Sequence, residues 1–190
     1  MHDQHFLVDK GILSKIVESA CLISKDKVLE IGVGDGRMTK ELCSRSNVIG
    51  VEIDRQFNVE DDNLEMHYGN ALELIDSLEF NKVVSNIPYS ITEALFKKLI
   101  KRDLDLVVLL IGKNFYDLLL EDGKWGKIIP VFYKVEKICD VSKDCFDPKP
   151  RVDSVVVKLV PRESLNEKER LLKEFVLQDD KKVKNALRES

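Results

Sequence analysis

The stretch "VLEIGVGDG", Val28 to Gly36, joins an apolar run to three glycines that stand at every second position. The run "KVLEI" is short and aliphatic, which is typical of a buried strand. A helix is expected from about Arg37 to Ser44, directly after the glycines. Glycine backbone between a strand and a helix can approach a ligand closely and offers free N–H groups at the helix start. The stretch therefore predicts a strand, a ligand-binding loop and a helix in succession.

Strands and helices alternate on both sides of this stretch. Further strands are expected in "NVIGVEID", "LEMHY", "NKVVS" and "LDLVVLLI". Helices are expected from about Gly11 onward and from roughly Glu93 to Lys101. Alternating strands and helices indicate a parallel sheet that is covered on both faces. The predicted fold class is therefore α/β, with a doubly wound sheet.

The last third of the chain has a different pattern. The β-rich runs "IIPVFYKVEKICDV" and "DSVVVKLV" have no helix of useful length between them, so we expect them to pair antiparallel as a hairpin at one edge of the sheet. Short helices are expected from about Asn166 onward. We place a boundary near "PRES", Pro161 to Ser164, which gives a main domain of residues 1–162 and a helical C-terminal segment of residues 163–190.

Length and composition suit one globular domain. The chain has 190 residues, of which 44% are hydrophobic, so it can bury a substantial core. We expect a cytoplasmic protein without a membrane segment, because no apolar run has the length of a span and the N-terminus lacks a signal-peptide pattern. We also expect a monomer. The four cysteines form no C-x-x-C pair, so we expect no metal site.

A net charge of −4 means that any surface that binds nucleic acid must be local. Basic residues gather in three places, and each cluster is either part of such a surface or an ordinary solvated face. The three clusters are Lys97, Lys98, Lys101 and Arg102; Lys149 and Arg151; and Lys181, Lys182, Lys184 and Arg188.

The glycine loop has an acidic partner on the next predicted strand. Glu52 stands twenty positions after Gly32, where a carboxylate commonly accepts hydrogen bonds from ribose hydroxyls. The third glycine of a dinucleotide motif would fall at Arg37, whereas this loop is G-x-G-x-G with Asp35 inside it. An acidic side chain would repel a pyrophosphate but tolerate the cationic groups of S-adenosylmethionine. The methyl donor is therefore favoured, and the alternative is a glycine turn that merely packs the helix on the strand.

The tetrapeptide "NIPY", Asn86 to Tyr89, follows the strand "NKVVS". Ligands bind at the carboxyl ends of parallel strands, so these residues are expected beside the glycine loop. Asn86 supplies a side-chain acceptor and Tyr89 a flat face. The Asn86 oxygen and a backbone carbonyl of Ile87 or Pro88 could accept the two hydrogens of an exocyclic amine, with its lone pair toward the donor methyl. The pattern suits an amine on a planar base.

The motif "NIPY" is similar to the N-[LIP]-P-[YF] motif of amino-group adenine methyltransferases. The chain as a whole resembles the KsgA-type small-subunit ribosomal RNA adenine N6,N6-dimethyltransferase family over nearly its full length. The segments that carry the resemblance are "QHFLVD", "VLEIGVGDG", "GVEID", "GNALEL" and "CFDPKPRVDSVVVKL". The resemblance implies a seven-stranded, Rossmann-like class I methyltransferase sheet.

The resemblance also implies roles for individual residues. The S-adenosylmethionine donor would contact His5, Leu7, Gly32, Gly34, Glu52, Asn70 and Asn86. Asn86 and Pro88 would bind the target amine, and the target adenine would lie between Tyr89 and Phe146. The family usually has Asn where this chain has His5, and Asp where it has Asn70. An uncharged amide at residue 70 would weaken donor binding by about 1 kcal/mol.

By this resemblance the chain transfers methyl groups from S-adenosylmethionine to the N6 amines of adjacent adenosines in small-subunit ribosomal RNA. Its partner would be that RNA or the small ribosomal subunit. Two alternatives remain open. One is an adenine methyltransferase that acts on another RNA or on DNA, including a monomethylating relative. The other is a ribosome-assembly factor with little catalysis. This alternative would suit a chain with fewer basic residues for phosphate contact than the family commonly has.

Overall fold

The computed structural model describes residues 4–163 and 165–177. The strands are β1 (Phe6–Leu7), β2 (Lys27–Ile31), β3 (Asn47–Glu52), β4 (Leu64–Tyr68), β5 (Lys82–Asn86), β6 (Leu106–Gly112), β7 (Tyr133–Val141), β8 (Phe146–Asp147) and β9 (Ser154–Pro161). The helices are α1 (Lys10–Ser19), α2 (Arg37–Cys43), α3 (Ala71–Leu74), α4 (Thr92–Leu99), α5 (Lys113–Leu120), α6 (Lys124–Phe132) and α7 (Glu167–Leu177).

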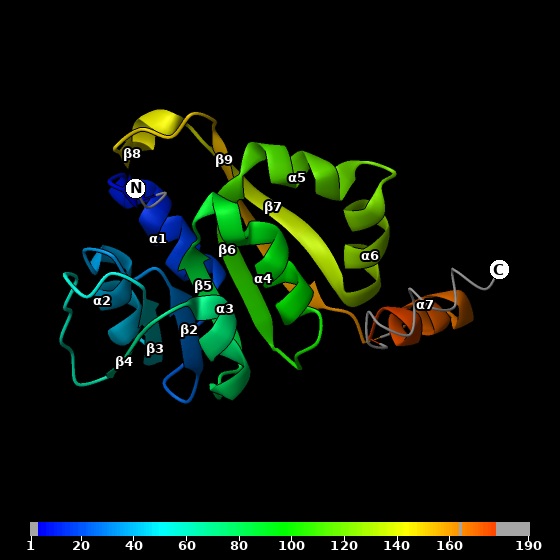
Figure 1. The fold of residues 1–190 in the computed structure, drawn as a ribbon, viewed down its shortest axis with the longest axis horizontal. Coiled ribbons are helices and arrows are strands. Elements are labelled where there is room, and N and C mark those ends of the chain that lie inside the picture. Colours follow the sequence, from blue (N-terminus) through cyan, green and yellow to red (C-terminus); the bar gives the residue numbers. More distant parts are fainter. Residues whose placement is uncertain (1–3, 164, 178–190) are drawn as a thin grey trace.

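Seven of the strands form one sheet in the order β4-β3-β2-β5-β6-β9-β7 (Figure 1). The first five of these strands are parallel, and β9 is antiparallel to both β6 and β7. The predicted doubly wound α/β sheet with an antiparallel edge is confirmed. The short strands β1 and β8 form a separate two-stranded antiparallel sheet.

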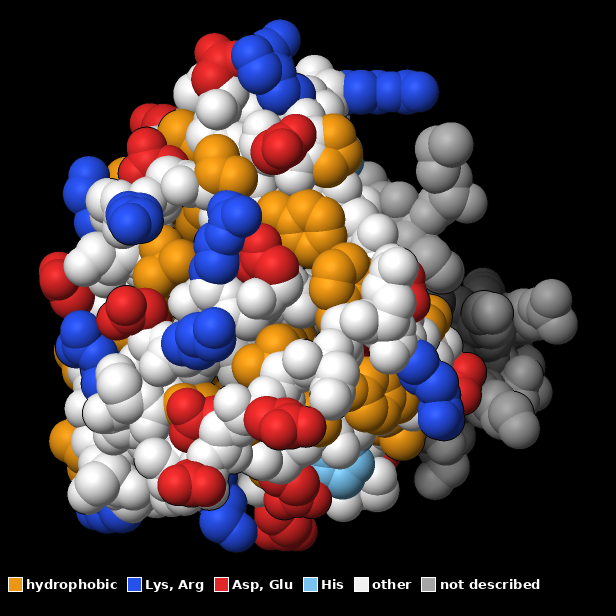
Figure 2. Space-filling view, turned by 90° about the vertical axis from the view of Figure 1, so that its left-hand side faces the viewer, with side chains coloured by type: hydrophobic (Ala, Val, Ile, Leu, Met, Phe, Trp, Pro, Cys, Tyr) orange, Lys and Arg blue, Asp and Glu red, His pale blue; other side chains and the backbone are white. Residues whose placement is uncertain are grey.

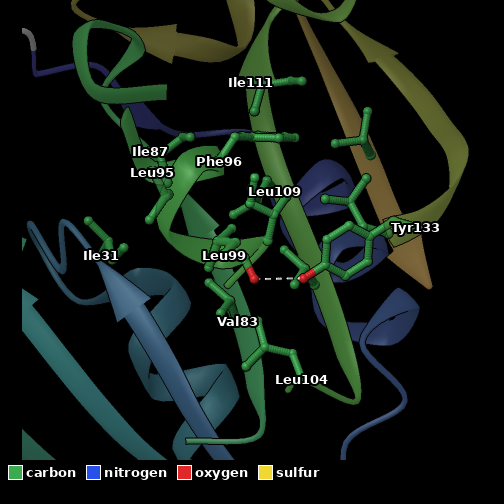
Figure 3. Close-up of a cluster of buried hydrophobic side chains, with 14 of the residues drawn as sticks. Ile31, Val83, Ile87, Leu95, Phe96, Leu99, Leu104, Leu109, Ile111 and Tyr133 are labelled. Atoms are coloured by element: carbon green, nitrogen blue, oxygen red, sulfur yellow. Dashed lines mark hydrogen bonds between the residues drawn. The ribbon is translucent and has the colours of Figure 1, made fainter. Parts of the chain in front are cut away.

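Helices cover both faces of the sheet because successive strand residues point to opposite sides. In β6, Val107 and Leu109 belong to the core under α3 to α6, whereas Val108 belongs to the core under α1 and α2. Figure 3 shows part of the first core, in which Leu95 and Leu99 of α4 lie close to Leu109 of the sheet. This packing fixes the strands and leaves their carboxyl ends to build a site.

One predicted strand is partly wrong. The run "IIPVF", residues 128–132, is the end of α6, and strand β7 begins only at Tyr133. Trp125, Ile129 and Phe132 recur at helical spacing, and all three are buried against the core, so tertiary packing favours the helix over the β-propensity of the run. The sequence pattern also did not indicate α5, which packs beside α6 in the same core.

The C-terminal part follows the expectation as far as it is described. Strands β7 and β9 pair antiparallel, with a register shift between Lys137 and Cys139. Helix α7 packs Leu172 and Val176 against the core beside α6. The division into domains of residues 1–162 and 163–190 stays a prediction, and the basic cluster that begins at Lys181 lies outside the described residues.

The amino ends of the central strands carry a closed polar network. The Lys82 Nζ atom lies 2.8 Å from a carboxylate oxygen of Asp26 and donates to the Cys21 carbonyl at 2.9 Å. The Asn81 amide nitrogen donates to Asp26 at 3.0 Å and to Asp105 at 2.7 Å. Every buried charge in this network therefore has an opposite charge or a hydrogen-bond partner.

Candidate active site

The glycine loop after β2 has a left-handed backbone at each of its three glycines. The φ angles of Gly32, Gly34 and Gly36 are 78°, 54° and 77°, a region that other residues adopt at a cost. A Cβ on Gly34 would lie 2.8 Å from the ring of Phe6, and one on Gly36 would lie 2.6 Å from Val59. Two covering segments therefore pack directly on this loop, and only glycine fits beneath them.

Glu52, at the end of β3, holds the loop in place. One carboxylate oxygen of Glu52 accepts a hydrogen bond from the Gly34 N–H at 2.9 Å. The other oxygen accepts from the N–H groups of Ile53 and Asp54 at 2.8 and 2.9 Å. Each carboxylate oxygen has two lone pairs, so the oxygen bonded to Gly34 can also accept from a ribose hydroxyl. The predicted ribose acceptor thus has a second role that the sequence pattern did not show.

A cavity of about 380 Å³ lies at the carboxyl ends of β2, β3 and β5. This volume is within the range of small-molecule sites. Nine of the ten residues predicted for donor or target binding line the cavity: His5, Leu7, Gly32, Gly34, Glu52, Asn70, Asn86, Pro88 and Tyr89. The structure thus brings together residues that are up to 84 positions apart in the chain.

Asn86, the last residue of β5, is oriented by the N-terminal segment. Its amide nitrogen donates to the His5 carbonyl at 3.0 Å, which leaves the amide oxygen as the acceptor for a ligand. The Pro88 carbonyl already accepts from the Ile91 N–H at 3.2 Å. Of the two carbonyls suggested by the sequence, that of Pro88 has only one lone pair left for an amine, and we take that of Ile87 as the second acceptor.

Phe146 is the predicted site residue that the structure does not bring into the cavity. Its side chain is 2% exposed and packs in the core under α1 and α2. Within the described residues, the ring of His5 lies beside Tyr89, with centroids 6.0 Å apart and planes inclined by 31°. The predicted contact of Phe146 with the target adenine stays a prediction.

Asn70 lines the cavity but also begins α3. Its amide oxygen accepts from the Leu72 N–H at 3.0 Å, as helix N-caps do, and its amide nitrogen donates to Glu73 at 3.0 Å. A single lone pair of the oxygen remains for a ligand amine. These two hydrogen bonds hold the uncharged side chain of Asn70 in place at the start of α3.

Among the cavity residues that sequence reasoning missed, two have distinctive surroundings. Glu30 is 1% exposed, and one of its carboxylate oxygens has no hydrogen-bond partner among the described residues. Burial, together with the charges of Glu52 and Asp35, raises the pKa of Glu30 to about 8. Ile53 is 56% exposed at the cavity. The available signals were an acid inside an apolar strand and an apolar residue directly after Glu52.

Three of the six described residues in the predicted basic clusters pair with acidic neighbours. Lys97 pairs with Glu93 at 3.3 Å, Lys98 pairs with Asp76, and Lys149 lies 2.8 Å from Asp144. Figure 2 shows Lys and Arg side chains interspersed with Asp and Glu on the face that it presents. These contacts favour a solvated, mixed-charge surface over a continuous basic face in this part of the molecule.

Neither a metal-ligand cluster nor a membrane-spanning helix is found in the described part of the chain. Within residues 4–163 and 165–177, no group of three or more His, Cys, Asp or Glu side chains is arranged to hold a metal ion. Over the same residues, no helix combines the length and the apolar character that crossing a lipid bilayer requires.

The structure is similar to solved methyltransferases. A dimethyladenosine transferase from Plasmodium falciparum superposes with a TM-score of 0.80 and 34% identity, over 88% of this chain and 69% of that chain. The 23S rRNA methyltransferase ErmE superposes with a TM-score of 0.73 at 24% identity, over 90% of this chain and 77% of that one, and supports the fold alone. The molecule has the Rossmann-like fold of class I methyltransferases.

Sequence comparisons define the family. The model of the ribosomal RNA adenine dimethylase family matches residues 1–190, and this chain belongs to that family. A probable ribosomal RNA small subunit methyltransferase A from Methanosarcina acetivorans is 38% identical, over 97% of this chain and 76% of the relative. A ribosomal RNA small subunit methyltransferase A from Prochlorococcus marinus is 36% identical over 97% and 77% of the two chains.

Proposed function

We propose that this chain transfers methyl groups from S-adenosylmethionine to the N6 amine of adjacent adenosines in small-subunit ribosomal RNA, giving dimethyladenosine. The observation that carries the proposal is the orientation of Asn86. Its amide nitrogen is bonded to the His5 carbonyl, so its oxygen is the atom available beside the glycine loop. The names of the family and of its relatives support ribosomal RNA as the substrate.

The donor supplies an activated methyl group, so the protein mainly orients and desolvates the reactants. The Asn86 oxygen and the Ile87 carbonyl accept the two N6 hydrogens and direct the nitrogen lone pair at the methyl carbon. The nitrogen–carbon bond forms as the carbon–sulfur bond breaks, and one N6 proton leaves to solvent. The nitrogen keeps one hydrogen and can react a second time.

Glu52 and the glycine loop would hold the donor. Glu52 is 4% exposed, and its bond to the Gly34 N–H ties the carboxylate to the loop that approaches the donor. Asn70 would accept from the adenine amine of the donor through its remaining lone pair. Tyr89 would stack on the target base. The proposal also includes the cytoplasmic location and the monomeric state that we expect from the sequence.

The test is transfer of labelled methyl to unmethylated small ribosomal subunits, followed by digestion of the RNA to nucleosides. We expect dimethyladenosine from the wild type and a loss of about 10²-fold or more in rate for Asn86→Ala, because a misplaced amine reacts slowly. Asn47→Ala is the matched control, since Asn47 begins β3 at the opposite end of the sheet and donates to the Ser24 carbonyl.

Three outcomes would contradict the proposal. Asn86→Ala with the rate of the wild type would remove the assigned role of the tetrapeptide. Donor binding in calorimetry without any transfer to the subunits would favour the assembly factor over the enzyme. Methylated adenosine on another nucleic acid, with none on the small subunit, would favour the alternative substrate.

A further inference from the structure

Ser154 is a buried hydroxyl close to the active site that the proposed mechanism does not use. It is the first residue of β9, it is 0% exposed, and it pairs across the sheet with Gly112 at the carboxyl end of β6. Its Oγ atom lies 2.5 Å from the Tyr89 hydroxyl. Ser154 thus reaches the proposed base-stacking ring from the strand behind it.

The same ring also lies against Gly112. A Cβ placed on Gly112 would be 3.5 Å from Cγ of Tyr89 and 3.6 and 3.7 Å from its two Cδ atoms. The ring therefore lies over Gly112 with room for no more than a methyl group between them, and it is hydrogen-bonded through its hydroxyl. Since Gly112 and Ser154 are paired residues of the sheet, both contacts come from one rigid element.

We propose that Ser154 is a positioning residue for methyl transfer, which fixes the Tyr89 ring in the orientation that receives the target adenine. The inference rests on the proposed function. A ring held at two points has little freedom to lose when a base stacks on it. Loss of the hydroxyl contact would let the ring tilt, and the N6 amine would then lie off the line to the methyl carbon.

The experiment combines Ser154→Ala, Tyr89→Phe and the double variant in the methyl-transfer assay on small ribosomal subunits. We expect kcat to fall about tenfold in each single variant, because each removes the same hydrogen bond. The double variant should be no slower than either single variant, since the two changes break one contact. The KM for the subunit and the Kd for the donor should change by less than about twofold.

Tyr133→Phe is the matched control for Tyr89→Phe. The Tyr133 hydroxyl donates to the Leu99 carbonyl at 2.9 Å inside the core (Figure 3), and neither residue lines the cavity. Its loss removes one buried hydrogen bond, as the test variant does, and should leave kcat unchanged. Tyr89→Phe also protects the test against misfolding of Ser154→Ala, because Tyr89 is only half-buried whereas Ser154 is fully buried.

A second readout does not need activity. The chain has four tyrosines, so ring-labelled tyrosine gives an NMR spectrum in which Tyr89→Phe identifies the Tyr89 signals. Ser154→Ala should shift these signals and leave the other three tyrosines in place. Unchanged Tyr89 signals, an unchanged kcat, or additive losses in the double variant would overturn the proposal. A wild type that transfers no methyl would instead refute the proposed function, whatever the spectrum shows.

Discussion

Asp26 and Glu30 are buried carboxyl groups at opposite ends of the same strand, and their surroundings differ. Asp26, just before β2, is 2% exposed and accepts hydrogen bonds from Lys82, Asn81 and the Ile23 N–H. Glu30, near the carboxyl end of β2, is 1% exposed and leaves one oxygen without a partner among the described residues. At the amino end of the sheet the polar groups hydrogen-bond to one another, whereas the carboxyl end holds polar groups that can hydrogen-bond to a ligand.

The pKa values of the two groups are shifted in opposite directions, as their surroundings predict. Burial alone would raise the pKa of Asp26, but the hydrogen bonds from Lys82 and Asn81 outweigh it and lower the pKa. Burial raises the pKa of Glu30 to about 8, so this carboxyl is mainly protonated at neutral pH. Substitutions at Asp26, Glu30 and Asp105 should therefore affect stability in different ways.

Asp26→Ala should lower the free energy of unfolding by about 3–5 kcal/mol, because it leaves the Lys82 ammonium buried without its partner. Urea denaturation of the variant and the wild type would measure this difference. Lys82→Met removes the other partner, and the double variant should lose less than the sum of the single losses. A loss below about 1 kcal/mol for Asp26→Ala would mean that the amino-end network does not hold the strands together.

Glu30→Gln should change how stability depends on pH. The folded-state pKa of Glu30 is raised from 4.5 to about 8, so its contribution to stability is fully present below pH 4.5 and is lost as the pH rises through about 8. The free energy of unfolding of the wild type should therefore fall over this range relative to that of Glu30→Gln. Thermal or urea unfolding at several pH values would show it, with the exposed Glu41→Gln as the control. Parallel curves for the wild type and Glu30→Gln would contradict the assigned ionisation.

Asp105→Ala should have the smallest effect, a loss of about 1 kcal/mol or less in the free energy of unfolding. Asp105 is exposed and accepts from the Asn81 amide at 2.7 Å, so water can replace it in the variant. The same urea titrations would measure it beside Asp26→Ala. A loss in the free energy of unfolding equal to that of Asp26→Ala would show that buried and exposed members of this network contribute equally to stability.

The sequence indicated the fold well where hydrophobic period and glycine spacing agreed, as in β2, its loop and α2. It failed over residues 128–132, because β-branched residues that are common in strands were packed into a helix by the core around Ile129. Local pattern carries no information about which distant residues will cover a segment. Helix α5, which precedes α6, was missed for the same reason.

The candidate site was likewise predicted in part. Motif spacing and the family resemblance together identified the candidate residues, and nine of the ten line one cavity. Their second roles depend on contacts that no motif records: Glu52 bonds to the Gly34 N–H, and Asn70 caps α3. The placement of Phe146 in the core likewise depends on how β8 meets the sheet. The donor and target contacts of all ten residues stay predictions.

The pairing of β1 with β8 has a consequence for synthesis on the ribosome. Leu7 is paired with Phe146, so the segment that covers the glycine loop has to wait for 139 further residues before its partner strand exists. Domains fold during synthesis as their segments emerge, and contacts between remote segments form late. The five parallel strands and the glycine loop can therefore assemble first on the nascent chain. The methyl-donor cavity gains its cover only after most of the chain has been translated.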